Sequence, residues 1–279
     1  MKGIIFGGCS FTWGQGLYFY SDLVDLKYPE SEYVFNQKEI TDAQIKFKNT
    51  LYYPRLVANH FNTFEVTKKD NGGSEDKTFD FFLNSLVPNL LGGRDIHQYL
   101  MLKKYDYVDF DYMIVQISHI FRNDFHFQLG GINYKTNVAP ILENRNEKNV
   151  KFFEWFDSND YTFNEWEKIQ IENQYIRLKK ELMFYEEKGI KTKILSWEND
   201  IVNYLKNDDF LSIRFIDLNY NGVSYSSIKD LQENNKNMVI KTDFDSFGNN
   251  PPLDHHPSKL CHEVITNSIV NNLIEKDLI

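Results

Sequence analysis

Apolar residues follow two patterns that alternate along most of the chain. Short runs rich in β-branched and aromatic residues are typical of buried parallel strands, and they occur at residues 3–6, 64–67, 111–117 and 191–197. Apolar residues at helical spacing predict helices at residues 50–61, 77–91, 164–188, 200–205 and 258–279. This alternation predicts a three-layer α/β/α domain with a mostly parallel sheet of about five strands, in which residues 238–241 are either the fifth strand or a loop.

Two stretches depart from the alternation, and we expect them to be insertions in a single domain that spans residues 1–279. Residues 15–49 have no sustained apolar period, so we interpret them as an insertion or an irregular lid. Residues 123–160 contain Gly130-Gly131 between two alternating segments, a pattern that predicts a two-residue β-hairpin. The strands of this hairpin are expected at residues 125–129 and 132–136.

Aromatic side chains make up 16% of the chain, and many of them follow the predicted hairpin. They are Phe152, Phe153, Trp155, Phe156, Tyr161, Phe163 and Trp166. Such rings either form the wall of a cleft that binds a sugar or an acyl group, or anchor the insertion to the body of the domain, as aromatic residues more often do. The sequence is compatible with both interpretations.

The segment Gly7-Gly8-Cys9-Ser10 follows the first predicted strand and carries a hydroxyl group among small residues. In open α/β sheets ligands bind at the carboxyl ends of the strands, and a helix that begins just after Ser10 would direct backbone N–H groups towards an oxyanion there. Ser10 is therefore a candidate nucleophile. The alternatives are an ordinary turn in which Ser10 or Thr12 caps the helix, and a nucleophilic Cys9, because a thiol at a helix N-terminus has a lowered pKa.

An acid and a base occur together near the other end of the chain, in Asp254-His255-His256, just before the last predicted helix. A serine hydroxyl becomes an effective nucleophile when a histidine accepts its proton and a carboxylate orients that histidine. Asp254 and His256 supply these two groups, so they form a candidate triad with Ser10. The same block and His262 also contain metal-ligand side chains, but their spacing fits no zinc pattern, and His262 is expected to face solvent or cap the helix.

With these residues the sequence resembles the SGNH (GDSL-like) hydrolase superfamily, whose serine lies in a Gly-x-Ser-like block near the N-terminus and whose Asp and His share one late block. Asn71-Gly72-Gly73-Ser74 resembles the family's second block, and a simple turn after the second strand is the alternative. The resemblance implies a flavodoxin-like α/β/α architecture and serine hydrolase activity that needs no cofactor or metal. It also implies an oxyanion hole that includes the N–H groups of Ser10 and Gly73.

The third block departs from the family pattern, which usually reads Gly-x-Asn-Asp. This chain has Gln116 in place of the glycine and Ser118 in place of the asparagine whose side chain completes the oxyanion hole. Ser118 still offers one hydrogen-bond donor. Asn123 is a second candidate donor if the loop curls back.

The last block departs in its spacing. It commonly reads Asp-x-x-His, whereas this chain has Asp254-x-His256, which we interpret as variation within the superfamily. If geometry forbids this pairing, His255 becomes the alternative base or Asp245 the alternative acid.

Three further residues, Trp13, Arg122 and Trp155, are candidates for substrate binding. Arg122 follows the third predicted strand and would steer an anionic substrate. Its alternative role is a surface ion pair with Asp124 or Asp111.

Charge and cysteine content exclude several other classes. A net charge of −9 and a pI near 5.3 disfavour binding to nucleic acid or to an anionic membrane, and no run approaches the ~18 apolar residues of a spanning helix. Two cysteines are too few for a disulfide framework, and no signal peptide is recognisable. These features predict a cytoplasmic protein, with a virus particle or another assembly as the alternative location, and leave the oligomeric state unknown.

We therefore expect a serine esterase. An acetylated glycan is the favoured substrate class, because the resemblance includes carbohydrate O-deacetylases and because aromatic residues crowd the second insertion. The altered third block suggests an alternative, namely a glycan-binding or structural protein that keeps the SGNH fold with weak or no catalysis, for instance as part of a virus particle.

Overall fold

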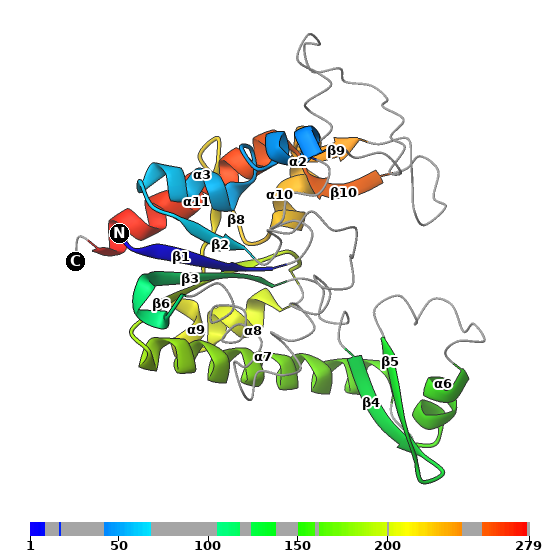
Figure 1. Ribbon diagram of the computed structural model, residues 1–279. Helices are drawn as coiled ribbons and strands as arrows, with labels where there is room; N and C mark the ends of the chain where they lie inside the picture. The colour runs from blue at the N-terminus through cyan, green and yellow to red at the C-terminus, as the bar shows by residue number, and fades with distance from the viewer. Residues whose placement is uncertain are drawn as a thin grey trace.

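The structure is a computed structural model and describes residues 1–8, 17, 42–67, 105–117, 124–137, 150–159, 162–199, 201–241 and 253–277. At its centre lies a parallel sheet whose strands are, in spatial order, β2 (Glu65–Thr67), β1 (Gly3–Gly7), β3 (Phe110–Ile117) and β6 (Lys191–Ser196) (Figure 1). A parallel bridge also joins Ile194 of β6 to Phe215. The mixed α/β class and all four of these predicted strands are confirmed.

One face of the sheet is covered by α3 (Tyr53–His60) and α11 (Lys259–Asp277), and α10 (Ile228–Asn234) adds to the same core (Figure 1). Side chains of a strand alternate between its two faces, so Ile4 and Phe6 of β1 face these helices while Ile5 faces the other way. The helices predicted at 50–61 and 258–279 are therefore present and lie on one side of the sheet.

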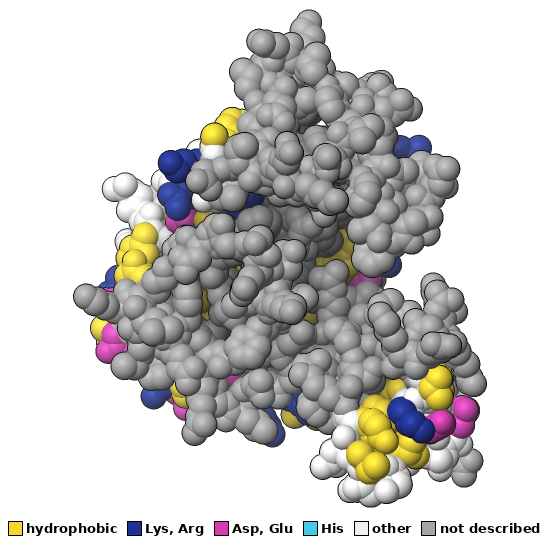
Figure 2. All heavy atoms as spheres, turned by 45° about the vertical axis from the view of Figure 1, so that its right-hand side comes forward, with side chains coloured by type: hydrophobic (Ala, Val, Ile, Leu, Met, Phe, Trp, Pro, Cys, Tyr) yellow, Lys and Arg dark blue, Asp and Glu magenta, His cyan; other side chains and the backbone are white. Residues whose placement is uncertain are grey.

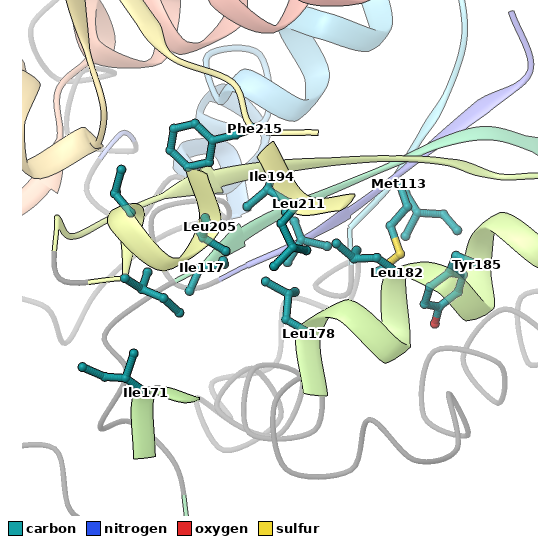
Figure 3. Close-up of a cluster of buried hydrophobic side chains, with 14 of the residues drawn as sticks. Met113, Ile117, Ile171, Leu178, Leu182, Tyr185, Ile194, Leu205, Leu211 and Phe215 are labelled. Atoms are coloured by element: carbon teal, nitrogen blue, oxygen red, sulfur yellow. The ribbon is translucent and has the colours of Figure 1, made fainter. Parts of the chain in front are cut away.

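The opposite face packs against α7 (Phe163–Glu187), α8 (Val202–Asn207) and α9 (Asp209–Ser212). Figure 3 shows Met113 of β3 and Leu182 of α7 in this second core. A capping box between Thr162 and Glu165 begins α7, and Gly189 follows its end with a φ of +83°. That conformation suits a glycine after a helix, as the sequence predicts.

The predicted hairpin is confirmed as β4 (Asp124–Leu129) paired antiparallel with β5 (Ile132–Asn137). Gly130 and Gly131 both have positive φ, at +58° and +79°, which is the requirement of a type I′ turn. A helix that the sequence analysis does not predict, α6 (Val150–Asp157), packs against this hairpin.

Other elements correct the expectations for the remaining stretches. A helix, α2 (Asp42–Lys48), lies within the stretch 15–49 that we interpret as an insertion or an irregular lid, so this stretch is not irregular throughout. Residues 238–241 contain β9 (Val239–Lys241), which pairs with β10 (Leu253–Pro257) in a separate two-stranded sheet and not with the central sheet. A further hairpin, which the sequence analysis does not predict, consists of β7 (Leu218–Tyr220) and β8 (Val223–Tyr225). The helix expected at 77–91 lies outside the described residues.

Candidate active site

The structure describes some of the site residues predicted from the sequence but not all of them. Six of them lie outside the described residues, namely Ser10, Trp13, Gly73, Ser118, Arg122 and Asn123. Asp254 and His256 lie on β10, where the structure describes the backbone but not these two side chains. Trp155 is described in full on α6. The described elements that lead into the predicted blocks include β1, β3, β10 and α11.

The carboxyl end of β1 leads towards the predicted nucleophile. Gly7 at this end pairs with Val115 of β3, and both Gly7 and Gly8 are buried. β1 lies between β2 and β3. The chain forms β2 on one side of β1 first and then returns to form β3 on its other side, so the direction of the strand order changes at β1. In parallel α/β sheets such a switch point is the place where ligands bind, beyond the carboxyl ends of the strands.

The junction between β10 and α11 is held by three hydrogen bonds of Ser258. Its backbone N donates to the Met238 carbonyl at 2.9 Å, and its Oγ donates to the Asn237 carbonyl at 2.7 Å. The same Oγ accepts from the backbone N of Cys261 at 3.2 Å, which caps the first turn of α11. In Figure 1 the β9–β10 pair lies beyond the carboxyl ends of the central strands, on the α11 side. These bonds fix the chain two residues after His256.

His262 connects α11 to the sheet, contrary to the expectation that it faces solvent or caps the helix. Its side chain is fully buried, and its Nδ1 accepts a hydrogen bond from the backbone N of Tyr53 at 3.2 Å. The Tyr53 and His262 rings stack at 5.7 Å between centroids, and Tyr53 meets Phe6 of β1 edge to face at 5.8 Å. The prediction was wrong because α3 covers this side of α11, which the local sequence does not indicate.

Gln116 occupies the carboxyl end of β3, beside the end of β1. Its residue number is even, like those of Tyr112 and Ile114, so it belongs to the face of the sheet that α3 and α11 cover. The side chain is fully buried, and its amide Nε2 donates to the Ile117 carbonyl at 2.9 Å. The predicted third block thus begins with a glutamine that is enclosed in the core of the sheet.

The end of β6 contributes an acidic residue that the sequence analysis did not identify. Glu198 is only 7% exposed, and its carboxylate lies 3.7 Å from Lys229 Nζ. The Ser196 hydroxyl donates to the Glu198 carbonyl at 2.6 Å, and the backbone N of Trp197 donates to the Ile117 carbonyl of β3 at 2.8 Å. The available signal was its place directly after a predicted strand, since polar residues at such ends face the ligand edge.

The aromatic residues of the second insertion mostly anchor it. Phe152 and Trp166 are almost completely buried and their rings pack edge to face at 5.6 Å. Trp155 is half-buried against Phe127, with 5.6 Å between ring centroids. Figure 2 shows hydrophobic side chains gathered on the surface of the hairpin and α6, where Ile132 is 58% exposed. Among the described rings, burial favours anchoring for Phe152, Phe153 and Trp166, whereas Trp155 and Phe156 are half-buried.

The only thiol in the described part of the chain belongs to Cys261. It is fully buried in α11 among core side chains, and burial raises the pKa of this thiol. A thiol without access to solvent and with a raised pKa is a poor nucleophile.

No family model matches this chain, and neither the curated proteins nor the solved structures contain a significant match. Among the helices that the structure describes, none is long and apolar enough to cross a membrane. Within the described side chains, no group of three or more His, Cys, Asp and Glu is arranged to hold a metal ion. The function has to follow from the residues of this chain and their arrangement.

Proposed function

We propose that this protein is a serine hydrolase of the SGNH type that acts on an ester. In this proposal His256 deprotonates Ser10, Asp254 orients His256, and the N–H groups of Ser10 and Gly73 stabilise the oxyanion. Ser118 or Asn123 supplies the third donor. The mechanism needs no cofactor.

The observation that carries the proposal is the contact chain from Phe6 through Tyr53 to His262. Phe6 lies four residues before Ser10, and His262 lies six residues after His256. Each block is thus only a few residues from one buried cluster that ties β1 to α11. A short tether of this kind supports a meeting of the two blocks at the carboxyl edge of the sheet.

The proposal includes a five-stranded flavodoxin-like sheet between two helical layers. The order β2-β1-β3-β6 corresponds to the first four positions of such a sheet, and the bridge between Ile194 and Phe215 supports a fifth position beside β6. Separate cores on the two faces support the layering.

The preferred substrate class is an acetyl ester on a carbohydrate, and the surface position of Trp155 near the hairpin supports an aromatic contact with a sugar ring. Acetate release from acetylated oligosaccharides, compared with hydrolysis of long-chain p-nitrophenyl esters, tests this choice. Faster turnover of the long-chain esters would contradict it.

The proposed nucleophile is tested by labelling the full-length protein with a fluorophosphonate probe and by assaying p-nitrophenyl acetate. We expect the parent and Cys9→Ala to be labelled and active, and Ser10→Ala to be neither. A Ser10→Ala variant that hydrolyses the ester as fast as the parent would end the assignment, and loss of labelling in Cys9→Ala alone would make the thiol the nucleophile.

A second candidate function is a binding or structural role on the same fold with little catalysis. It is favoured by the altered third block, in which Ser118 stands where the family pattern has the donor asparagine, and Gln116, buried and bonded to the Ile117 carbonyl, stands where it has a glycine. Loss of one oxyanion donor typically costs about 10²–10³ in rate. A folded parent protein that does not react with the fluorophosphonate probe would support this candidate and contradict the enzyme.

A further inference from the structure

A groove lies between α7 and α8, on the face of the sheet opposite α11. Its volume is about 490 Å³, within the range of roughly 300–1,000 Å³ that is usual for small-molecule sites. The residues that line it combine aromatic, amide and acidic side chains. They are Glu172, Tyr175, Ile176, Asn203, Tyr204 and Asp208, with Asn207 at the end of α8.

Two tyrosines form the apolar part of the groove. The rings of Tyr175 and Tyr204 are 6.4 Å apart between centroids and tilted by 35°, so they lie side by side without covering each other. Both side chains are half-buried and pack partly against the core, which holds the rings in place. Ile176 beside them is 43% exposed. The rings therefore present fixed apolar faces to whatever enters.

Polar groups without a structural role flank these rings. In the part of the chain that the structure describes, the side chains of Glu172, Asn203 and Asn207 make no hydrogen bond, and both asparagines are exposed. Each amide offers donors and acceptors, and the carboxylate offers acceptors. These groups are available to a ligand that carries several hydroxyl groups.

Asp208, in contrast, is fully used by the fold. Its Oδ1 accepts from the backbone N of Phe210 at 2.9 Å and of Leu211 at 3.0 Å, and its Oδ2 accepts from Lys179 Nζ at 2.7 Å. These bonds hold the pKa of Asp208 below its usual value against the effect of burial. Lys179 is thereby engaged as well, and Glu172 remains the uncompensated charge in the groove.

This charge pattern selects the class of ligand. A phosphate or carboxylate group would meet the Glu172 carboxylate, and none of the described residues that line the groove is a lysine or an arginine, so an anionic ligand is disfavoured. An acyl chain would use the ring faces but none of the amides. A sugar ring has an apolar C–H face that stacks on aromatic rings and a rim of hydroxyl groups that both donate and accept hydrogen bonds.

We propose that the groove formed by Tyr175, Tyr204, Asn203 and Asn207 is a binding site for a neutral oligosaccharide. The site does not depend on the hydrolase activity proposed above, because it lies on the α7–α8 side of the sheet and uses none of the residues of that activity. One or two sugar units stack on the tyrosines while the asparagine amides bind their hydroxyl groups.

The test is calorimetric titration of the full-length protein with neutral hexasaccharides, namely cellohexaose, xylohexaose and N-acetylchitohexaose, and with hexagalacturonate and choline as charged probes. We expect at least one neutral hexasaccharide to bind. Hexagalacturonate should bind more weakly because its carboxylates meet Glu172, and choline should bind more weakly because, although Glu172 and the rings attract a cation, its single hydroxyl group cannot use both asparagine amides. Tyr204→Ala should weaken binding about tenfold, and Tyr204→Phe, which keeps the ring, by no more than about threefold.

Two further variants guard against a folding artefact, because Tyr204 packs partly on the core. Asn203→Ala and Asn207→Ala change exposed side chains and should each weaken binding about threefold or more. Tyr220→Ala, at a half-buried tyrosine elsewhere, and Asn164→Ala, at an exposed asparagine of α7, are matched controls that should bind as the parent does.

Several results would overturn the proposal. These are no binding of any neutral probe at millimolar concentration, binding that is unchanged in Tyr204→Ala and Asn203→Ala, and tighter binding of choline or hexagalacturonate. Because the titration needs no catalysis, a catalytically silent Ser10→Ala protein should bind the oligosaccharide as the parent does, which separates this outcome from a failure of the proposed function.

Discussion

The two long helices on opposite faces of the sheet are buried in different ways. On α11, between residues 259 and 274, only Asn267, Asn271 and Ile274 are exposed. On α7 the buried side chains, such as Leu178 and Leu182, form one stripe, and the rest of the helix is largely exposed. α7 thus buries one side and exposes the other, whereas α11 is enclosed on most sides.

This difference shows what a local pattern can and cannot indicate. An enclosed helix buries polar side chains as well, and in α11 two of the buried ones, Thr266 and Ser268, have hydrogen-bond partners. Thr266 Oγ1 donates to the His262 carbonyl at 2.7 Å, and Ser268 Oγ accepts from the backbone N of Asn219 at 2.9 Å. These partners come partly from distant segments, so the apolar spacing predicts the helix but not the burial of its polar positions.

The largest effect is expected where the chain enters α11, at the proposed acid and base. Asp254→Asn removes the group that orients His256, so kcat/KM should fall by about 10³–10⁴. In the parent, kcat/KM should fall on acidification below about pH 6.5, the ordinary pKa of histidine, because a general base acts in its neutral form. Steady-state kinetics across pH measure both.

The control for this prediction lies on α7, where Glu187→Gln changes an exposed carboxylate and should leave kcat/KM unchanged. The same assay on His255→Ala and His256→Ala identifies the base. Activity that survives His256→Ala but not His255→Ala would show that the other histidine is the base, and activity in both would exclude the triad.

Substitutions that leave a cavity in either core should lower the free energy of unfolding by similar amounts, although α11 is enclosed and α7 is exposed on one side. Ile269 of α11 and Leu182 of α7 are both fully buried, so Ile269→Ala and Leu182→Ala should each lower the free energy of unfolding by about 2–5 kcal/mol. Urea titration measures this. Met183→Ala, at a side chain of α7 that is 43% exposed, should change it by less than about 0.5 kcal/mol. A large loss there would mean that the exposed stripe of α7 is covered in solution.

Only α7 buries a carboxyl group in its core stripe among the described side chains of the two helices. Glu181 is 3% exposed, and burial raises its pKa from 4.5 to about 7, partly offset by the nearby Tyr185 hydroxyl. The Tyr107 hydroxyl interacts electrostatically with Glu181 as well. Burial raises the pKa of Tyr107 and the pKa of Tyr185. Protonated Glu181 is the form that suits the core.

The sign of the pH dependence follows from this raised pKa. The folded chain holds the proton more tightly than the unfolded chain, so the stability from Glu181 is complete below about pH 4.5 and is lost as the pH rises to about 7. Glu181→Gln should therefore be more stable than the parent at pH 8, by on the order of 3 kcal/mol, and similar to it at pH 4.5. Equal differences at both pH values, measured by urea titration, would contradict this account.

The smallest effect is expected at the link between α11 and α3. His262→Phe keeps a ring beside Tyr53 but removes the acceptor of the Tyr53 N–H, which should cost about 1–3 kcal/mol of unfolding free energy. His60→Phe, at an exposed position of α3, is the matched control and should change it by less than about 0.5 kcal/mol. An unchanged stability of His262→Phe would show that this hydrogen bond contributes little.

Elements with a strong local signal could be predicted from the sequence. The Gly130-Gly131 turn and the apolar spacing of α7 define their elements without help from distant residues. The β7–β8 hairpin carried the same kind of signal in Asn221-Gly222, whose φ values are +51° and +79°, and was nevertheless missed. Its strands have only three residues each, too few to show alternation.

The candidate site was predictable as a set of blocks but not as an arrangement. Ser10, Asp254 and His256 were selected by residue type and order in the chain. The contact between Tyr53 and His262 that supports their meeting joins residues that are 209 positions apart, and no local pattern encodes it. The same holds for the groove on α7 and α8, whose two tyrosines become neighbours only when the helices pack.

The order of strands in the sheet also affects how the chain is synthesised. β1 is made before its partner β3, and the bond from Lys2 N to Asp111 spans 109 positions of the chain. At about 5–20 residues per second, the ribosome needs on the order of ten seconds to deliver that partner. During this interval the apolar strand 3–7 lacks its neighbour, and α11, which is made after both strands, closes one face over it.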